Sequence, residues 1–142
     1  MMSFAQLSIF AIVFAAIGGV TVWKSWAAPH KPGAGASSIG LVMVTDKNND
    51  GSPNYGDTVT FRIATTATNQ PYVSLQCLQG TSLVLNGSAG FFAGALNSGY
   101  DFNLTSGSWA SGSADCTAAL GMYGGKHSTW QQLAVTSFHV NP

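Results

Sequence analysis

The chain has 142 residues, enough for one domain with its own hydrophobic core and an appendage. Only 7% of the residues are charged, against about 25% in an ordinary soluble domain, and the five basic and five acidic residues cancel. A nucleic-acid-binding protein needs a basic face, so this composition excludes that class of partner.

Residues 1–27 contain an uncharged apolar segment, from Phe4 to Trp23, which is about 30 Å long as a helix. That length suits a hydrophobic α-helix that spans a bilayer. Small residues around Ala27 also suit signal-peptidase cleavage, although the first six residues carry no Lys or Arg. Three interpretations stay open: a retained membrane anchor, a cleaved signal peptide, and a helix that packs against its copies in an assembly.

Residues 28–38 are rich in Pro, Gly and Ser and predict a linker, because they carry too little apolar surface to fold. An apolar N-terminal helix that leads into a β-domain resembles the architecture of pilin-like subunits. This resemblance implies a subunit of an extracellular filament or virion.

Side-chain oxygens recur at positions 1, 3, 5, 9 and 12 of the segment 46–57, around a glycine at position 6. That spacing is typical of the EF-hand calcium loop, and the segment is also similar to the loop of dockerin modules. The expected calcium ligands are Asp46, Asn48, Asp50, the backbone carbonyl of Ser52, Asn54 and Asp57. The competing interpretation is a metal-free turn between two strands, because Asp, Asn, Gly and Pro all favour turns.

From Ile39 to the end of the chain, short apolar alternations separated by turn residues predict an antiparallel β-sandwich over residues 39–142. A turn is expected at Asn86-Gly87-Ser88, and Trp109 is expected to fill the core rather than to face a ligand. The expected strands are residues 39–44, 58–63, 72–78, 81–85, 100–104, 116–122 and 133–140.

The two cysteines, Cys77 and Cys116, lie on separate apolar segments of this β-domain. One disulfide is the simplest interpretation, and a loop of this size would make it worth about 3–4 kcal/mol. The alternative is a pair of buried free thiols.

The text Gly-Asp-Thr-Val-Thr-Phe at residues 56–61 resembles bacterial Ig-like surface domains. Trp109, followed by a Ser-Gly-rich turn and Ala-Asp-Cys-Thr-Ala at residues 114–118, is similar to a group of bacterial exported proteins. These resemblances imply an Ig-like β-sandwich over about residues 39–140. The first cysteine falls on the third β-segment, so the bridge is expected to join other strands than in antibody domains.

The sequence contains no nucleophile elbow, zinc-protease motif or phosphate loop, and the histidines of the β-domain, His127 and His139, have no recognisable catalytic partner. The sequence therefore predicts that the protein is not an enzyme. Tyr123 and Trp130 are candidates for a sugar-binding face, and packing within the domain is the alternative.

The leading hypothesis is an exported cell-surface protein with a structural or adhesive role, whose Ig-like domain is stabilised by calcium and one disulfide. It would be membrane-anchored through its N-terminal helix or extracellular. One alternative is a self-assembling filament or virion subunit with other copies as partners, because a surface with few charges offers little repulsion between copies. The other alternative is a carbohydrate-binding module with a glycan as ligand.

Overall fold

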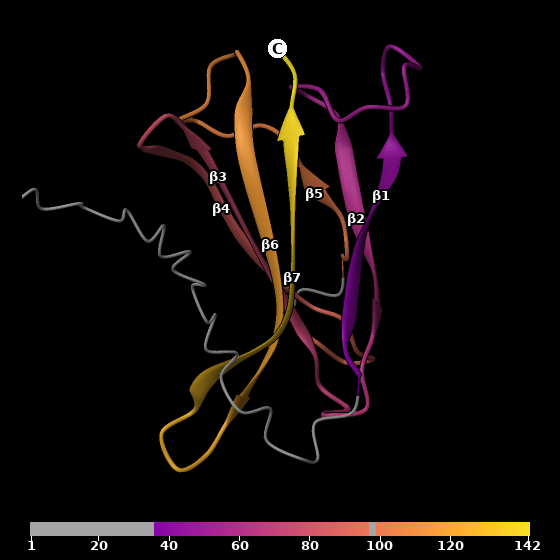
Figure 1. The fold of residues 1–142 in the computed structure, drawn as a ribbon, viewed down its shortest axis with the longest axis vertical. Coiled ribbons are helices and arrows are strands. Elements are labelled where there is room, and N and C mark those ends of the chain that lie inside the picture. Colours follow the sequence, from indigo (N-terminus) through magenta and orange to yellow (C-terminus); the bar gives the residue numbers. More distant parts are fainter. Residues whose placement is uncertain (1–35, 97–98) are drawn as a thin grey trace, which may run out of the picture. The chain divides into compact units, whose positions relative to one another are not determined.

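The computed structural model describes residues 36–96 and 99–142, and it confirms the prediction of an all-β domain with two antiparallel sheets (Figure 1). The helix expected at residues 1–27 and the linker up to residue 35 lie outside the described residues. Within the described ranges, no helix has the length and apolar character needed to cross a membrane. The strands are β1 (Ser38–Thr45), β2 (Thr58–Ala64), β3 (Tyr72–Gln79), β4 (Ser82–Gly90), β5 (Phe102–Asn103), β6 (Ala114–Gly124) and β7 (Thr129–Val140).

The smaller sheet has the strand order β1-β2-β5, with β2 in the centre. Alternation along β2 decides which side faces the core, because successive side chains of a strand point to opposite faces. Val59 and Phe61 are buried, whereas Arg62, the residue after Phe61, is exposed. β5 pairs with β2 over only two residues, so this sheet is narrow at that edge.

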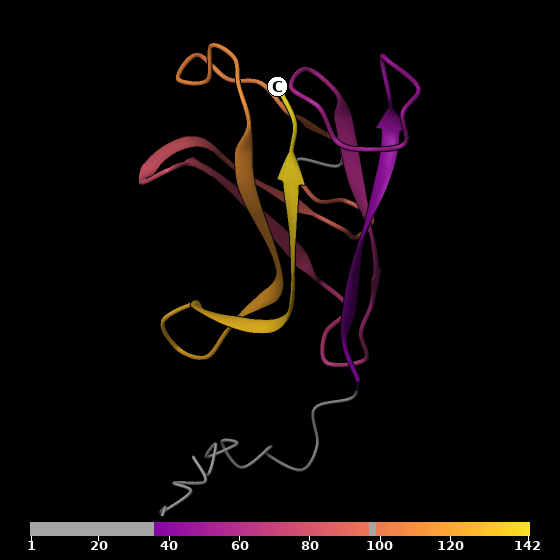
Figure 2. The same cartoon turned by 45° about the horizontal axis from the view of Figure 1, so that its top comes forward.

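The larger sheet has the order β4-β3-β6-β7, and β6 and β7 form a long hairpin at one edge (Figure 2). On β3, Val73, Leu75 and Cys77 are fully buried, as their alternation predicts. Ser74 and Gln76, which alternate with them, point to the outer face of the sheet.

The core lies between the two sheets and is completed by aromatic side chains. Phe61 of β2 contacts Phe102 of β5 and Phe138 of β7, with ring centroids 5.6 and 6.3 Å apart. Trp109, in the connection from β5 to β6, is fully buried, and its indole N–H donates to the carbonyl of Gly112 at 3.0 Å. The prediction that Trp109 fills the core is confirmed.

The turn predicted at Asn86-Gly87-Ser88 is wrong, because these residues lie inside β4. The strand continues to Gly90 instead, and the turn that precedes it contains Gly80, whose φ of +61° suits glycine. Gly87 pairs with Leu75 of β3, and a Cβ atom there would lie in ordinary contact with the ring of Phe102, at 3.4 Å. The strand expected over residues 100–104 is also shorter than predicted, because only Phe102 and Asn103 pair with β2.

Candidate functional site

The segment 46–57 forms the loop from β1 to β2, at the end of the domain where the chain also ends (Figure 1). Its second half is tied to distant segments by backbone hydrogen bonds. Tyr55 N–H donates to the carbonyl of Asn141 and Asn141 N–H donates to that of Pro53, both at 2.9 Å. Gly56 N–H donates to the carbonyl of Leu104 at 3.1 Å. The loop is thus fixed to the residue after β7 and to the segment after β5.

Four oxygen atoms converge within this loop on one nitrogen, the side-chain Nδ2 of Asn54. They are Oδ1 of Asn48 at 3.3 Å, Oδ1 and Oδ2 of Asp50 at 3.1 and 3.2 Å, and the carbonyl oxygen of Ser52 at 2.8 Å. An amide NH₂ group has two hydrogens and cannot satisfy four acceptors at once. The Asn54 amide therefore lies at the centre of an oxygen cluster. Other donors also bind three of these oxygens: the Asp50 N–H donates to Oδ1 of Asn48, and the Ser52 N–H and the Asn48 amide donate to Oδ1 and Oδ2 of Asp50.

The carboxylate of Asp50 is held in its charged form by donors around it. The Ser52 backbone N–H, at 2.7 Å, is the main cause that lowers the pKa of Asp50, and a weaker desolvation effect opposes it. The amides of Asn48 and Asn54 lower this pKa further. Asp50 is consequently an anion at neutral pH, in the middle of the oxygen cluster.

Asp46 and Asp57 bind the loop's own backbone. The two oxygens of Asp46 accept the N–H groups of Asn49 and Gly51, both at 2.8 Å. Asp57, only 1% exposed, accepts the N–H groups of Lys47 at 3.1 Å and Asn54 at 2.9 Å. Each carboxylate oxygen has further lone pairs, so holding a backbone N–H is compatible with binding an ion.

The kinds of ligand atom in the loop decide which metal it suits. Among residues 36–96 and 99–142, no three side chains of His, Cys, Asp or Glu come together as metal ligands. The cluster around Asn54 instead combines amide, backbone carbonyl and carboxylate oxygens. Calcium accepts this mixture of oxygen ligands, whereas zinc and the softer transition metals prefer nitrogen and sulfur.

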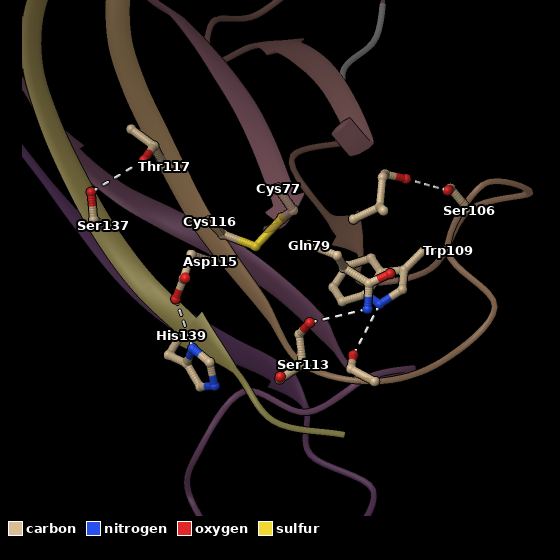
Figure 3. Close-up of a disulfide and its surroundings, with 12 residues drawn as sticks. Cys77, Gln79, Ser106, Trp109, Ser113, Asp115, Cys116, Thr117, Ser137 and His139 are labelled. Atoms are coloured by element: carbon tan, nitrogen blue, oxygen red, sulfur yellow. Dashed lines mark hydrogen bonds and ion pairs between the residues drawn. A yellow bond between two sulfur atoms is a disulfide. The ribbon is translucent and has the colours of Figure 1, made fainter. Parts of the chain in front are cut away.

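The two cysteines lie directly opposite each other on the neighbouring strands β3 and β6, with their sulfurs 1.99 Å apart in a disulfide (Figure 3). The bond therefore lies within one sheet, whereas the conserved bridge of antibody domains joins the two sheets. On the outer face of the same sheet, Nδ1 of the exposed His139 lies within hydrogen-bond distance of Oδ1 of Asp115, at 2.7 Å. His127, the other histidine of the β-domain, is exposed at the β6–β7 turn.

Tyr123 and Trp130 face each other across β6 and β7 on the outer face of the larger sheet. Their ring centroids are 5.3 Å apart, and 54% of Tyr123 is exposed. The two rings form one wall of a groove of about 530 Å³. Its other polar lining residues are Ser74, Gln76, Asn86, Ser88, Thr117 and Gln132.

Comparison with protein-family models, with curated proteins and with solved structures finds no match to this chain. The sequence pointed to the two aromatic residues of the groove but missed its polar floor. Alternation could have placed Gln76 on the outer face of β3, but the register of three strands is needed to bring it beside Asn86 and Thr117.

Proposed function

We propose that this protein is an exported, non-enzymatic structural or adhesive protein whose β-domain is stabilised by calcium bound in the loop 46–57. One observation carries the calcium proposal: four oxygens surround the single amide nitrogen of Asn54. That nitrogen marks the point where a cation would satisfy all four.

The cation needs only a local rearrangement. Rotating the Asn54 amide by a half-turn replaces Nδ2 by Oδ1, and such flips leave the shape of the side chain unchanged. Asn48, Asp50, Ser52 and Asn54 then offer five oxygens. Asp46 and Asp57 retain free lone pairs, and water can complete the six to eight oxygens that calcium takes at about 2.3–2.6 Å. The carboxylate of Asp50 supplies negative charge within the cluster, and Asp46 and Asp57 add charge from elsewhere in the loop.

The proposed fold is Ig-like. The strand orders β1-β2-β5 and β4-β3-β6-β7 place seven strands in two antiparallel sheets, and this division is compatible with the sandwich of Ig-like and related cell-surface domains. Domains of this kind host many unrelated roles, so the fold by itself does not specify a ligand.

Export is supported by the disulfide between β3 and β6, because such bonds persist in oxidising compartments. The apolar segment of residues 4–23 supports the same location, either as a signal or as an anchor through which the membrane or other copies become partners. Mass spectrometry of alkylated protein taken directly from cells tests this part. A chain recovered fully reduced from the cytosol would contradict export.

Calorimetric titration of the full chain with CaCl₂ tests the metal site. The expected dissociation constant is about 10⁻⁴–10⁻³ M, the range of extracellular calcium modules. Asp50→Ala should abolish binding, because it removes two of the convergent oxygens. Asp115→Ala is the matched control: it also removes one exposed carboxylate, but far along the chain on β6, and should leave binding unchanged. Native protein that binds no calcium in this range, or an Asp50→Ala variant that binds normally, would refute the proposal.

A further inference from the structure

The larger sheet presents a groove of about 530 Å³ on its outer face, lined by residues of β3, β4, β6 and β7. This volume lies within the range of about 300–1,000 Å³ typical of small-molecule sites. The groove belongs to other strands than the loop 46–57, so it is independent of the calcium proposal.

The floor of the groove is polar and uncharged. Gln76, Asn86 and Gln132 carry amides, each of which both donates and accepts hydrogen bonds, and Ser74, Ser88 and Thr117 carry hydroxyls. Of the described residues that line the groove, none is charged. A phosphate, sulfate or carboxylate ligand would find no cation here, whereas a neutral ligand with many hydroxyl groups would find both hydrogen-bond donors and acceptors.

The aromatic wall is held in place by close packing. A Cβ atom on Gly121 would lie 2.4 Å from Cζ2 of Trp130, so the indole lies directly against the backbone of β6. Trp130 contacts Tyr123, Tyr123 contacts Tyr72, and Tyr72 contacts Phe92, each pair with ring centroids 5.3 Å apart. A ring fixed in this way loses little conformational freedom when a ligand binds.

We propose that this groove binds a neutral oligosaccharide. Trp130 and Tyr123 would contact the apolar C–H face of a sugar ring, and the amides of Gln76, Asn86 and Gln132 would bind its hydroxyl groups. Aromatic rings beside hydrogen-bonding side chains suit a ligand that is itself apolar on one face and polar at its rim.

Other occupants fit less well. An added β-strand needs a free strand edge, but β3 and β6, which carry the centre of the groove, have hydrogen-bonded strands on both sides. A second copy of the chain would bury the polar floor against groups of the same kind, and stable interfaces between copies are more apolar than this. The remaining candidate of matching chemistry is the neutral sugar.

The test uses the full chain in a detergent without a sugar headgroup. It is screened against neutral glycans (β-1,4-glucan, chitin oligomers, mannan, xylan and galactan) and against acidic ones (polygalacturonate and a sulfated glycan). We expect binding to at least one neutral class and not to the acidic ones. A calorimetric titration then gives the affinity, with tryptophan fluorescence as a second readout.

Trp130→Ala should weaken binding by about tenfold or more, and Gln76→Ala by about three- to tenfold, as expected for a lost ring contact and a lost hydrogen bond. Gln76 is exposed, so its variant tests the groove even if Trp130→Ala fails to fold. Val135→Ala, also exposed on β7 but outside the groove, and Asp50→Ala in the loop should both bind as the native chain does. An Asp50→Ala variant that no longer binds calcium can therefore still be used to test the sugar site.

Three results would overturn the inference. The first is the absence of binding to every neutral glycan. The second is an affinity that neither Trp130→Ala nor Gln76→Ala changes. The third is self-association of the native chain that Trp130→Ala abolishes, because the groove would then be a contact between copies.

Discussion

Calcium should raise the melting temperature of the β-domain, because an ion that binds only the folded loop stabilises the folded state by mass action. With a dissociation constant of about 10⁻⁴–10⁻³ M, a calcium concentration of about 10 mM adds roughly 1.4–2.7 kcal/mol. The entropy of unfolding of a domain of about 100 residues is about 0.2 kcal/mol per kelvin, so the expected rise is about 7–13 °C.

Differential scanning calorimetry measures this rise directly. The comparison is between the chain with CaCl₂ and the chain with chelator and NaCl at matched ionic strength, because screening alone also changes stability. Magnesium should produce a smaller rise, since it demands a tighter octahedral arrangement and keeps its waters. Asp50→Ala should abolish the response to calcium, since it removes the carboxylate at the centre of the cluster.

The calcium response should also depend on pH. Hydrogen bonds lower the pKa of Asp50, so its carboxylate contributes stability that is complete above the usual Asp pKa of about 3.9. This contribution is lost as the pH falls through the lowered pKa, and protons then compete with calcium. Equal melting temperatures with calcium and with chelator at neutral pH would refute the reasoning and leave a metal-free turn.

Three further predictions concern stability. Asp57→Asn should cost about 1–3 kcal/mol even without calcium, because an amide NH₂ would face one of the two backbone N–H groups that this buried carboxylate accepts. Urea denaturation measures the cost, and Asp115→Asn on the exposed outer face should change stability by less than about 0.5 kcal/mol. Reducing the disulfide, which joins residues 39 apart in sequence, should lower the free energy of unfolding by about 4 kcal/mol, and an unchanged denaturation midpoint would argue against a bond that constrains the unfolded chain. Gly121→Ala should cost about 1–3 kcal/mol and shift the fluorescence of Trp130, whereas Gly40→Ala, with nothing within 4 Å of the new Cβ, should do neither.

Strands with strict alternation could be predicted from the sequence, because the cause of their placement is local. Val73, Leu75 and Cys77 recur with the two-residue period of a strand and are all fully buried. The prediction failed where a residue serves a distant partner. Gly87 belongs to a turn-forming tripeptide, but it pairs with Leu75 of β3 inside a continuous strand, which no local pattern reveals.

The two candidate sites also differ in how far the sequence could predict them. The spacing of oxygen-bearing residues indicated the loop 46–57, and the structure brings three of the expected ligands, Asn48, Asp50 and Ser52, together around a fourth, Asn54. The groove could not be predicted as a whole, because Gln76, Asn86 and Thr117 become neighbours only through the pairing of three strands. The aromatic wall of the groove could be predicted from the sequence, because Tyr123 and Trp130 lie on either side of one hairpin turn.

The loop's attachments determine whether calcium can stabilise the whole domain. If the loop could open by itself, bound calcium would oppose only that local opening, and the melting temperature of the domain would not change. The hydrogen bonds of Pro53 and Tyr55 with Asn141, and of Gly56 with Leu104, make this independent opening costly. The loop should therefore unfold together with β7 and with the segment after β5. On this basis calcium is expected to shift a single cooperative transition, and hydrogen exchange should show Tyr55 and Asn141 amides protected together.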